Sequence, residues 1–303
     1  MAKATRAALG ETLIELVDNG ADIIAVDADL AGSTTLGKFG VAHPGRFVDV
    51  GIAEQNMIGV ASGLALTGKT VFTGSFAVFG SGRCWEQIRN TVCVTNLDVK
   101  VCPTHAGITV GPDGETHQAL EDIALMRVLA PADYESARAA IRLAAATPGP
   151  FYVRLGRETP LAVYDEPFEL ESPAYARVLR EGADISIMAC GVEVGFALEA
   201  AAALAEQGIS AEVVDVMSIK PLDEDVILAS AAKTGCVLTV EEHSVYGGMG
   251  SAVAELLAER APMRVVRAGM TGFGQSGTAG ELLAHYGLDV AGIAAKVREV
   301  LGR

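Results

Sequence analysis

Apolar residues along the chain follow two alternating patterns. Segments of helical periodicity alternate with short runs rich in β-branched residues, and this alternation is typical of a parallel sheet wrapped by helices. In the first half of the chain, the pattern predicts strands at 22–28, 46–50, 70–76, 99–105 and 151–156. It predicts helices at 6–19, 53–67, 82–95, 117–127 and 134–146.

The alternation breaks near Pro160. Residues 159–173 hold three prolines and several acids, which is typical of a surface linker. The pattern then resumes, with strands at 185–191, 211–218, 236–242 and 263–269 and helices at 192–207, 223–232, 249–260 and 289–301. We therefore expect an α/β protein with two open, mostly parallel-sheet domains. They would span 1–160 and 177–303, joined by a linker at 161–176.

Composition narrows the class of protein. The 303 residues are 50% apolar and 20% charged, which indicates a globular protein. The longest uncharged stretches contain polar residues and the N-terminus lacks a long apolar core, so we expect no membrane span, no signal peptide and a cytoplasmic location. The net charge of −15, without a cluster of basic residues, disfavours nucleic acid as a partner.

Cysteine usage argues against a metal or disulfide framework. The chain has five cysteines and none has CxxC spacing, so we expect reduced, structural thiols. They are Cys84, Cys93, Cys102, Cys190 and Cys236.

Two glycine clusters have alternative explanations. "GFGQSG" at 272–277 fits a dinucleotide-binding pattern, but no acid follows at a strand end about twenty residues later. "YGGMG" at 246–250 precedes a helix whose N-terminus could receive an anion. Close packing of helix against sheet explains either cluster equally well.

Glu54 is the single charge between Val50 and Gly68. At the start of a helix, an acid gains roughly 0.3–1 kcal/mol from the helix dipole, which is a purely structural explanation. On a 3.6-residue repeat, however, Glu54 shares a face with Met57, Ile58 and Ala61. If that face is buried, the carboxyl group needs either a proton or a partner.

Three chemically versatile side chains gather in "THAGITVGPDGETHQ", residues 104–118. His105, Asp113 and His117 lie around a glycine-rich turn after a predicted strand, where α/β sheets present ligand-binding groups. A metal site is the rival interpretation, although the spacing matches no standard metal motif. Phe76 and Phe79 follow another strand, and they could be core residues or a clamp for a planar ring.

Several of these segments resemble one enzyme family. "RFVDVGIAEQNMIGVASGLALTG", "TGSFAVFGSGRCWEQIR" and "THAGITVGPDGETHQALEDIALMRVLAP" occur in the order found in the pyrimidine-binding domain of transketolases. "SIKPLDED", "VEEHSVYGGMGSAVAE" and "GFGQSGTAGELLAHYGL" are similar to the C-terminal domain of the same enzymes. The resemblance covers essentially the whole chain.

The resemblance implies a thiamine diphosphate site. Glu54 would hydrogen-bond the cofactor's aminopyrimidine ring, and we expect it to be an isolated acid, since a nearby charge would compete for the ring's proton. Phe76 and Phe79 match ring-stacking aromatics, and Gly82 stands where many transketolases carry a third. Asp29 matches an acid near the thiazolium.

The resemblance also implies a sugar phosphate site. His105, Asp113 and His117 match groups that contact sugar hydroxyls and assist proton transfer. Arg6, Ser33 and Arg157 match residues that bind the substrate phosphate.

One family motif is missing from the sequence. Transketolases carry a GDG motif that holds Mg²⁺ (or Ca²⁺) and the cofactor's diphosphate, and no such motif occurs here. The resemblance therefore implies the C-terminal subunit of a split transketolase, which transfers a two-carbon ketol unit from a ketose phosphate to an aldose phosphate. A separate N-terminal subunit would hold the metal, in an α2β2 assembly.

Other functions remain open at this point. Relatives with the same cofactor are the β subunit of a 2-oxo acid dehydrogenase E1 component and half of a deoxyxylulose phosphate synthase; the histidines of residues 104–118 favour transketolase. A noncatalytic regulatory subunit of the same fold and a dinucleotide-binding protein are alternatives from other classes.

Overall fold

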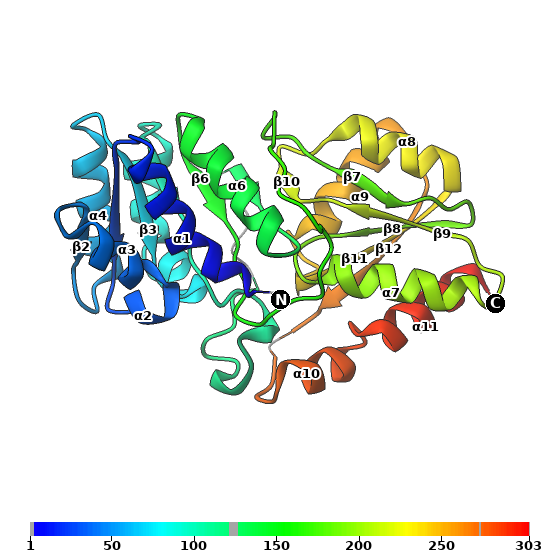
Figure 1. Cartoon of the computed structure of the whole chain (residues 1–303). Coiled ribbons are helices and arrows are strands. Elements are labelled where there is room, and N and C mark those ends of the chain that lie inside the picture. The colour runs from blue at the N-terminus through cyan, green and yellow to red at the C-terminus, as the bar shows by residue number, and fades with distance from the viewer. Residues whose placement is uncertain (1–2, 121–126, 273, 303) are drawn as a thin grey trace.

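The structure is a computed structural model that describes residues 3–120, 127–272 and 274–302. It contains two α/β units, each built around one sheet (Figure 1). The predicted fold class, two mostly parallel sheets covered by helices, is confirmed.

A seven-stranded sheet forms the first unit. Its strands are β1 (Ile23–Asp27), β2 (Phe47–Asp49), β3 (Thr70–Gly74), β4 (Val99–Val101), β5 (Arg127–Leu129), β6 (Phe151–Val153) and β10 (Ser218–Lys220). They lie in the order β10-β5-β6-β4-β3-β1-β2, and all pair in parallel except β10, which is antiparallel to β5. Strands β4 and β6 are buried along their whole length, as expected for a sheet covered on both faces.

Helical elements pack on both faces of this sheet. Their bounds are α1 (Thr5–Asp18), α2 (Ala31–Thr34), α3 (Leu36–Ala42), η1 (Pro44–Arg46), α4 (Glu54–Ala65), η2 (Val78–Arg83), α5 (Trp85–Gln87), η3 (Ile88–Cys93), η4 (Ile108–Asp113) and α6 (Tyr134–Ala146). Apolar residues of α1, α3 and α6 share one core cluster, whereas those of α4 and η3 belong to another. The two clusters correspond to the two faces of the sheet.

A five-stranded sheet forms the second unit. Its strands are β7 (Arg177–Arg180), β8 (Ile185–Ala189), β9 (Ala211–Asp215), β11 (Cys236–Ser244) and β12 (Arg264–Met270), in the order β12-β11-β8-β9-β7. The helices are α7 (Glu193–Ala205), α8 (Glu224–Thr234), α9 (Met249–Arg260), α10 (Ala279–Tyr286) and α11 (Val290–Leu301). Residues of α7, α10 and α11 form the core on one face, and those of α8 and α9 pack on the other.

The two units are joined at one edge of the first sheet. Strand β10 follows β9 in the chain, yet it extends the first sheet beside β5. Next to it, the amide of Ala130 donates to the carbonyl of Met217 at 2.8 Å. The polypeptide that builds the second sheet therefore also completes the first.

Most predicted elements are observed. Helices at 134–146 and 249–260 have the predicted bounds. The helix predicted at 117–127 is wrong at the residues that the structure describes, because 118–120 are not helical and Arg127 begins strand β5; residues 121–126 lie outside the described part. The helix predicted at 82–95 is an irregular helical segment that begins earlier, at Val78, with two π-helical turns around α5.

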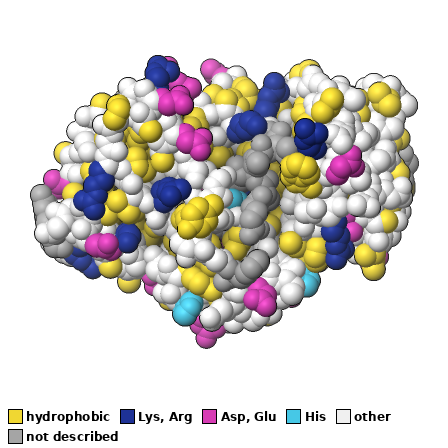
Figure 2. All heavy atoms as spheres, turned by 180° about the vertical axis from the view of Figure 1, so that it is seen from behind, with side chains coloured by type: hydrophobic (Ala, Val, Ile, Leu, Met, Phe, Trp, Pro, Cys, Tyr) yellow, Lys and Arg dark blue, Asp and Glu magenta, His cyan; other side chains and the backbone are white. Residues whose placement is uncertain are grey.

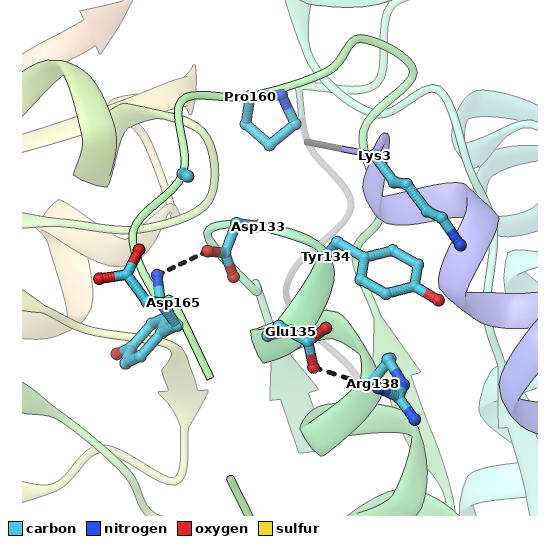
Figure 3. A pocket seen from close by; sticks show the side chains of 9 residues that line it. Lys3, Asp133, Tyr134, Glu135, Arg138, Pro160 and Asp165 are labelled. Carbon is cyan, nitrogen blue, oxygen red and sulfur yellow. Dashed lines mark hydrogen bonds and ion pairs between the residues drawn. The ribbon is translucent and has the colours of Figure 1, made fainter. Parts of the chain in front are cut away.

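Residues 154–176 contain no helix or strand and run between the units. Asp133, which caps α6 through the amide of Ser136, also accepts hydrogen bonds from the linker amides of Val163 at 2.9 Å and Tyr164 at 2.7 Å. Asp133 lines a pocket of about 500 Å³. Figure 3 shows Asp133 in this pocket, between α6 and residues of the linker. The Tyr164 hydroxyl then donates to Asp215 at the end of β9. The linker is thus fastened to both units.

The surface carries charges of both signs. On the face seen in Figure 2, basic and acidic side chains are interspersed among apolar and neutral ones. Within the described part of the chain, no helix is both long and apolar enough to cross a bilayer.

Candidate active site

Glu54 begins helix α4 and is almost completely buried. Its exposed fraction is 5%, and Met57, Ile58 and Ala61 on the same face are at most 1% exposed. The face that Glu54 shares with these residues on a 3.6-residue repeat is therefore buried, which is the case in which the carboxyl group needs a proton or a partner. A carboxylate in such a place is costly unless another group satisfies it.

Arg83 satisfies Glu54 in this structure. One guanidinium nitrogen of Arg83 lies 3.0 Å from Oε1 of Glu54. The same guanidinium lies over the ring of Phe79, with its carbon 4.1 Å from the ring centre. The expectation that Glu54 is an isolated acid is wrong, because the chain brings a cation to it from 29 positions away.

Phe76 and Phe79 form a short aromatic stack beside this ion pair. Their ring centres are 6.1 Å apart and their planes differ by 12°. Phe76 pairs with Thr104 in an isolated parallel bridge, which places it at the end of β3 next to the segment after β4. Phe79 lies on the π-helical turn η2, a type of turn that often occurs at functional sites.

His105 is buried against Phe76 with its two ring nitrogens engaged. The ring centres are 4.0 Å apart, Nδ1 is 2.7 Å from the Thr104 hydroxyl and Nε2 is 3.3 Å from a guanidinium nitrogen of Arg6. Burial, followed by the charges of Arg6 and Arg157, lowers the pKa of His105 to about 3. His105 is therefore neutral near pH 7, and since Arg6 can only donate, we assign the proton to Nδ1.

His117 contacts the aromatic stack by its edge. Its ring centre is 5.2 Å from that of Phe79 and 6.2 Å from that of Phe76. The structure does not assemble His105, Asp113 and His117 into a metal site: in the described ranges, no three His, Cys, Asp or Glu side chains are placed to hold an ion. The stack instead lies between two imidazoles.

Arginines gather on the far side of His105. A guanidinium nitrogen of Arg6, on α1, donates to the carbonyl of Ser33 at 3.1 Å. Arg157 donates to the carbonyl of Val110 and lies 3.6 Å from Asp113. Burial and the charge of Arg157 lower the pKa of Arg6. Two cations close enough to repel one another favour an anion between them.

Two family models match the sequence. The transketolase pyrimidine binding domain matches residues 1–160, and the transketolase C-terminal domain matches residues 174–293. The chain belongs to the transketolase family. The resemblance drawn from sequence motifs is thereby confirmed.

Individual relatives agree with this assignment. A protein of Methanocaldococcus jannaschii, provisionally named a transketolase C-terminal section, is 47% identical and covers 98% of this chain and 96% of its own. A 6-deoxy-6-sulfo-D-fructose transketolase subunit of a Clostridium species is 42% identical, covering 97% and 93%. A solved structure described as a split gene transketolase, inactive β4 tetramer, is 45% identical, with a TM-score of 0.89 over 100% of this chain and 99% of that one.

Transketolase-family proteins use thiamine diphosphate, and the residues present fit its ring. Glu54 and Phe79 already hold a planar, nitrogen-bearing group, the guanidinium of Arg83. A carboxylate at the edge and an aromatic face below are the contacts that an aminopyrimidine requires. When bound, the cofactor supplies an electron sink for cleavage next to a carbonyl group.

Ten residues were predicted for the site from the sequence. Asp29 is the one among them that makes no described contact with the other nine. It is exposed, has a positive φ of 64°, and its amide donates to Asp49. Asp49 also accepts from the amide of Gly51, in the loop that leads to Glu54. The nearby Asp27 is buried, and burial raises its pKa to about 6; it accepts from Leu30 and Thr34 and stabilises the turn after β1.

Residues of the second unit contact the segment 104–118, which contains His105 and His117. Glu242 accepts from the amide and hydroxyl of Thr109, and the Gln118 amide donates to the carbonyl of Gln275. A Cβ on Gly274 would lie 1.9 Å from the Gln118 side chain, so only glycine fits there. Gly274 of "GFGQSG" thus permits close packing against residues 104–118, which is a structural explanation of that glycine.

The other glycine cluster is filled from within. Glu241 accepts hydrogen bonds from the amides of Met249 and Gly250 at the start of α9, so a side chain of the protein already occupies this helix N-terminus.

Burial raises the pKa of Cys84 to about 12, and it also raises the pKa values of the cysteines at positions 93, 102 and 190. These thiols are poor nucleophiles, as predicted from their spacing.

Two site residues were not predicted from the sequence. Arg83 reaches Glu54 because it lies on the π-helical turn η2, and residue propensities do not predict such a turn. Thr104 hydrogen-bonds Nδ1 of His105 at 2.7 Å, and its position directly before that histidine was the available signal.

We predict that His105 stays neutral in the folded chain well below pH 6. In ¹⁵N-histidine NMR spectra assigned with His105→Gln, its ring should keep the shifts of the neutral Nδ1–H form from pH 8 to 5. Because the unfolded chain takes up this proton near 6.5 and the folded chain only near 3, acidification through that window lowers the free energy of unfolding. A ring that titrates near pH 6.5 in the folded protein would contradict the described environment.

Proposed function

We propose that the chain is the C-terminal subunit of a split transketolase. It transfers a two-carbon ketol unit from a ketose phosphate to an aldose phosphate, with thiamine diphosphate and a separate N-terminal subunit. The observation that carries the proposal is a continuous line of contacts. It runs from Glu54 through Arg83 to Phe79, and on through Phe76 and His105 to Arg6. It joins a ring site to a site with hydroxyl-binding and anion-binding groups.

Glu54 holds a proton against the pyrimidine ring. Its burial means that the carboxyl group is stable beside the ring when it shares a proton with a ring nitrogen. Phe79, and Phe76 behind it, fix the plane of the ring, while Gly82 leaves that side of the turn open. Asp29 lies at the loop that leads to Glu54, and we assign it to the other end of the cofactor.

His105 and His117 bind and relay protons from the sugar. We assign Nε2 of neutral His105 as an acceptor, because Nδ1–H is used by Thr104. In this structure Nε2 accepts from Arg6 at 3.3 Å, and a sugar hydroxyl would take the place of that donor. His117 lies at the other edge of the aromatic stack, and Asp113 provides an acceptor for a hydroxyl group. A neutral imidazole can take a proton from a hydroxyl and return it in the same cycle.

Arg6, Ser33 and Arg157 bind the anionic end of the sugar. Their local positive charge stands out in a chain of net charge −15 and suits a phosphate. A relative in the same family is named for 6-deoxy-6-sulfo-D-fructose, whose end group is also an anion. The chemistry therefore points to sugars with a charged terminus, and phosphate is the one we propose.

The partner is an N-terminal transketolase subunit, which holds Mg²⁺ or Ca²⁺ and the cofactor's diphosphate. Relatives are named as a section, a subunit and an inactive β4 tetramer of a split enzyme, and each name supports a need for a second polypeptide. Two copies of each subunit is the assembly we propose.

The exposed face of α4 supports the same conclusion. Outward-facing positions just before, on and just after this helix are uncharged, and they include Ile52, Gly59, Gly63 and Leu66, of which Ile52 is 77% exposed. Trp85, beside Arg83, is 50% exposed. A strip of small and apolar residues on the helix that begins with Glu54 suits a packed subunit interface.

Glu54→Gln should abolish ketol transfer without unfolding the chain. The amide keeps the shape of the side chain but cannot share a proton with the ring, so we expect a loss of at least about 100-fold. The assay mixes the chain with the N-terminal subunit, thiamine diphosphate, Mg²⁺, xylulose 5-phosphate and ribose 5-phosphate. Glu86→Gln, an exposed acid on α5, is the control. Full activity of Glu54→Gln, at unchanged thermal stability, would remove Glu54 from the mechanism.

Arg157→Ala should weaken the use of phosphorylated sugars. Loss of one charged contact to phosphate predicts a rise in KM on the order of 10- to 100-fold, with a smaller change in kcat. The KM for an unphosphorylated ketose should change much less, and Arg46→Ala, in a pair with Asp22 elsewhere, should change neither. An unchanged KM for xylulose 5-phosphate in Arg157→Ala would reject the phosphate role.

A further inference from the structure

Arg83 makes the two contacts that the proposed ring site offers. Its guanidinium pairs with the Glu54 carboxylate at 3.0 Å and lies 4.1 Å above the Phe79 ring. A guanidinium is planar, carries N–H donors at its edge and stacks on aromatic faces. An aminopyrimidine has the same three properties. Both groups therefore require the same carboxylate oxygen and the same ring face.

The backbone of Arg83 is fixed by hydrogen bonds and buried neighbours, whereas its side chain is open to solvent. The Gln55 side chain donates to the Arg83 carbonyl at 3.0 Å, and the next residue, Cys84, is buried with its thiol against the Gly80 carbonyl. The Arg83 side chain is 51% exposed, in contrast to 5% for Glu54. The guanidinium can therefore leave toward solvent by side-chain rotation, without any change in the π-helical turn.

We infer that Arg83 and the pyrimidine ring of the cofactor compete for Glu54 and Phe79, so that Arg83 sets the affinity of the site for thiamine diphosphate. The inference rests on the proposed function. Binding of the ring would exchange one partner of Glu54 for another: the ion pair breaks, the arginine returns to water, and the carboxylate takes up one proton from solvent, which it then shares with the ring nitrogen. Glu54 is never left buried without a partner.

Competition lowers the apparent affinity of the cofactor. The apparent dissociation constant equals the intrinsic one divided by the fraction of chains in which Arg83 has left the site. Because the Arg83 member of the ion pair is half exposed, solvent screens its charge and the fraction of chains in which it has left is not very small. Removing the guanidinium should therefore tighten binding by roughly 5- to 10-fold. A residue that helped to hold the ring would have the opposite effect.

The test is calorimetric titration of thiamine diphosphate, with Mg²⁺, into the full chain assembled with its N-terminal subunit. Arg83→Met keeps a long stem without the charge, and Arg83→Gln is a second variant in case the first does not assemble. Arg89→Met is the matched control, since Arg89 is exposed on η3 and donates to the neighbouring Asn90. We expect Kd to fall in both Arg83 variants and to stay unchanged in the control.

The outcomes separate this inference from the proposed function. If the wild-type assembly binds the cofactor and both Arg83 variants bind it equally or more weakly, competition is overturned while the transketolase assignment stands. If neither wild type nor variants bind thiamine diphosphate, the proposed function fails and the inference fails with it.

Discussion

A carboxyl group buried at the start of helix α4 is the constraint on which the site depends. Helix α4 presents Glu54 on the same face as the core residues Met57 and Ile58, so the acid enters the interior as the helix packs on the sheet. The cost of such burial is several kcal/mol unless a donor or a proton is supplied. The protein solves this with Arg83, and the proposed cofactor ring would solve it in the same way.

The remaining groups of the site follow Glu54 in an order that runs from apolar to cationic. Next to the ion pair lie two aromatic rings, then a histidine that burial and two arginines keep neutral, and finally the arginines themselves. A neutral imidazole between an aromatic stack and a cationic cluster can exchange protons with hydroxyl groups, while the cations would bind the charged terminus of the proposed substrate. The order of side chains thus matches the order of groups in a sugar phosphate placed beside a ring cofactor.

Sequence patterns predicted the parts of this arrangement that depend on local periodicity. The helix at 134–146 and the set of residues that share a face with Glu54 follow from 3.6-residue spacing, and the parallel sheets follow from short β-branched runs. Contacts between distant segments could not be predicted. Arg83 reaches Glu54 through a π-helical turn, β10 leaves the second unit to pair with β5, and Arg127 joins a sheet where the local pattern favoured a helix. In each case tertiary pairing outweighs local propensity.

The account as a whole claims that this polypeptide provides the ring half of a cofactor site and another polypeptide provides the rest. Equilibrium dialysis of thiamine diphosphate with Mg²⁺ tests it directly, using the chain alone, the N-terminal subunit alone and their mixture. The account predicts saturable binding by the mixture at cofactor concentrations where neither chain alone retains it. Tight binding by this chain alone, with turnover of sugar phosphates, would contradict it.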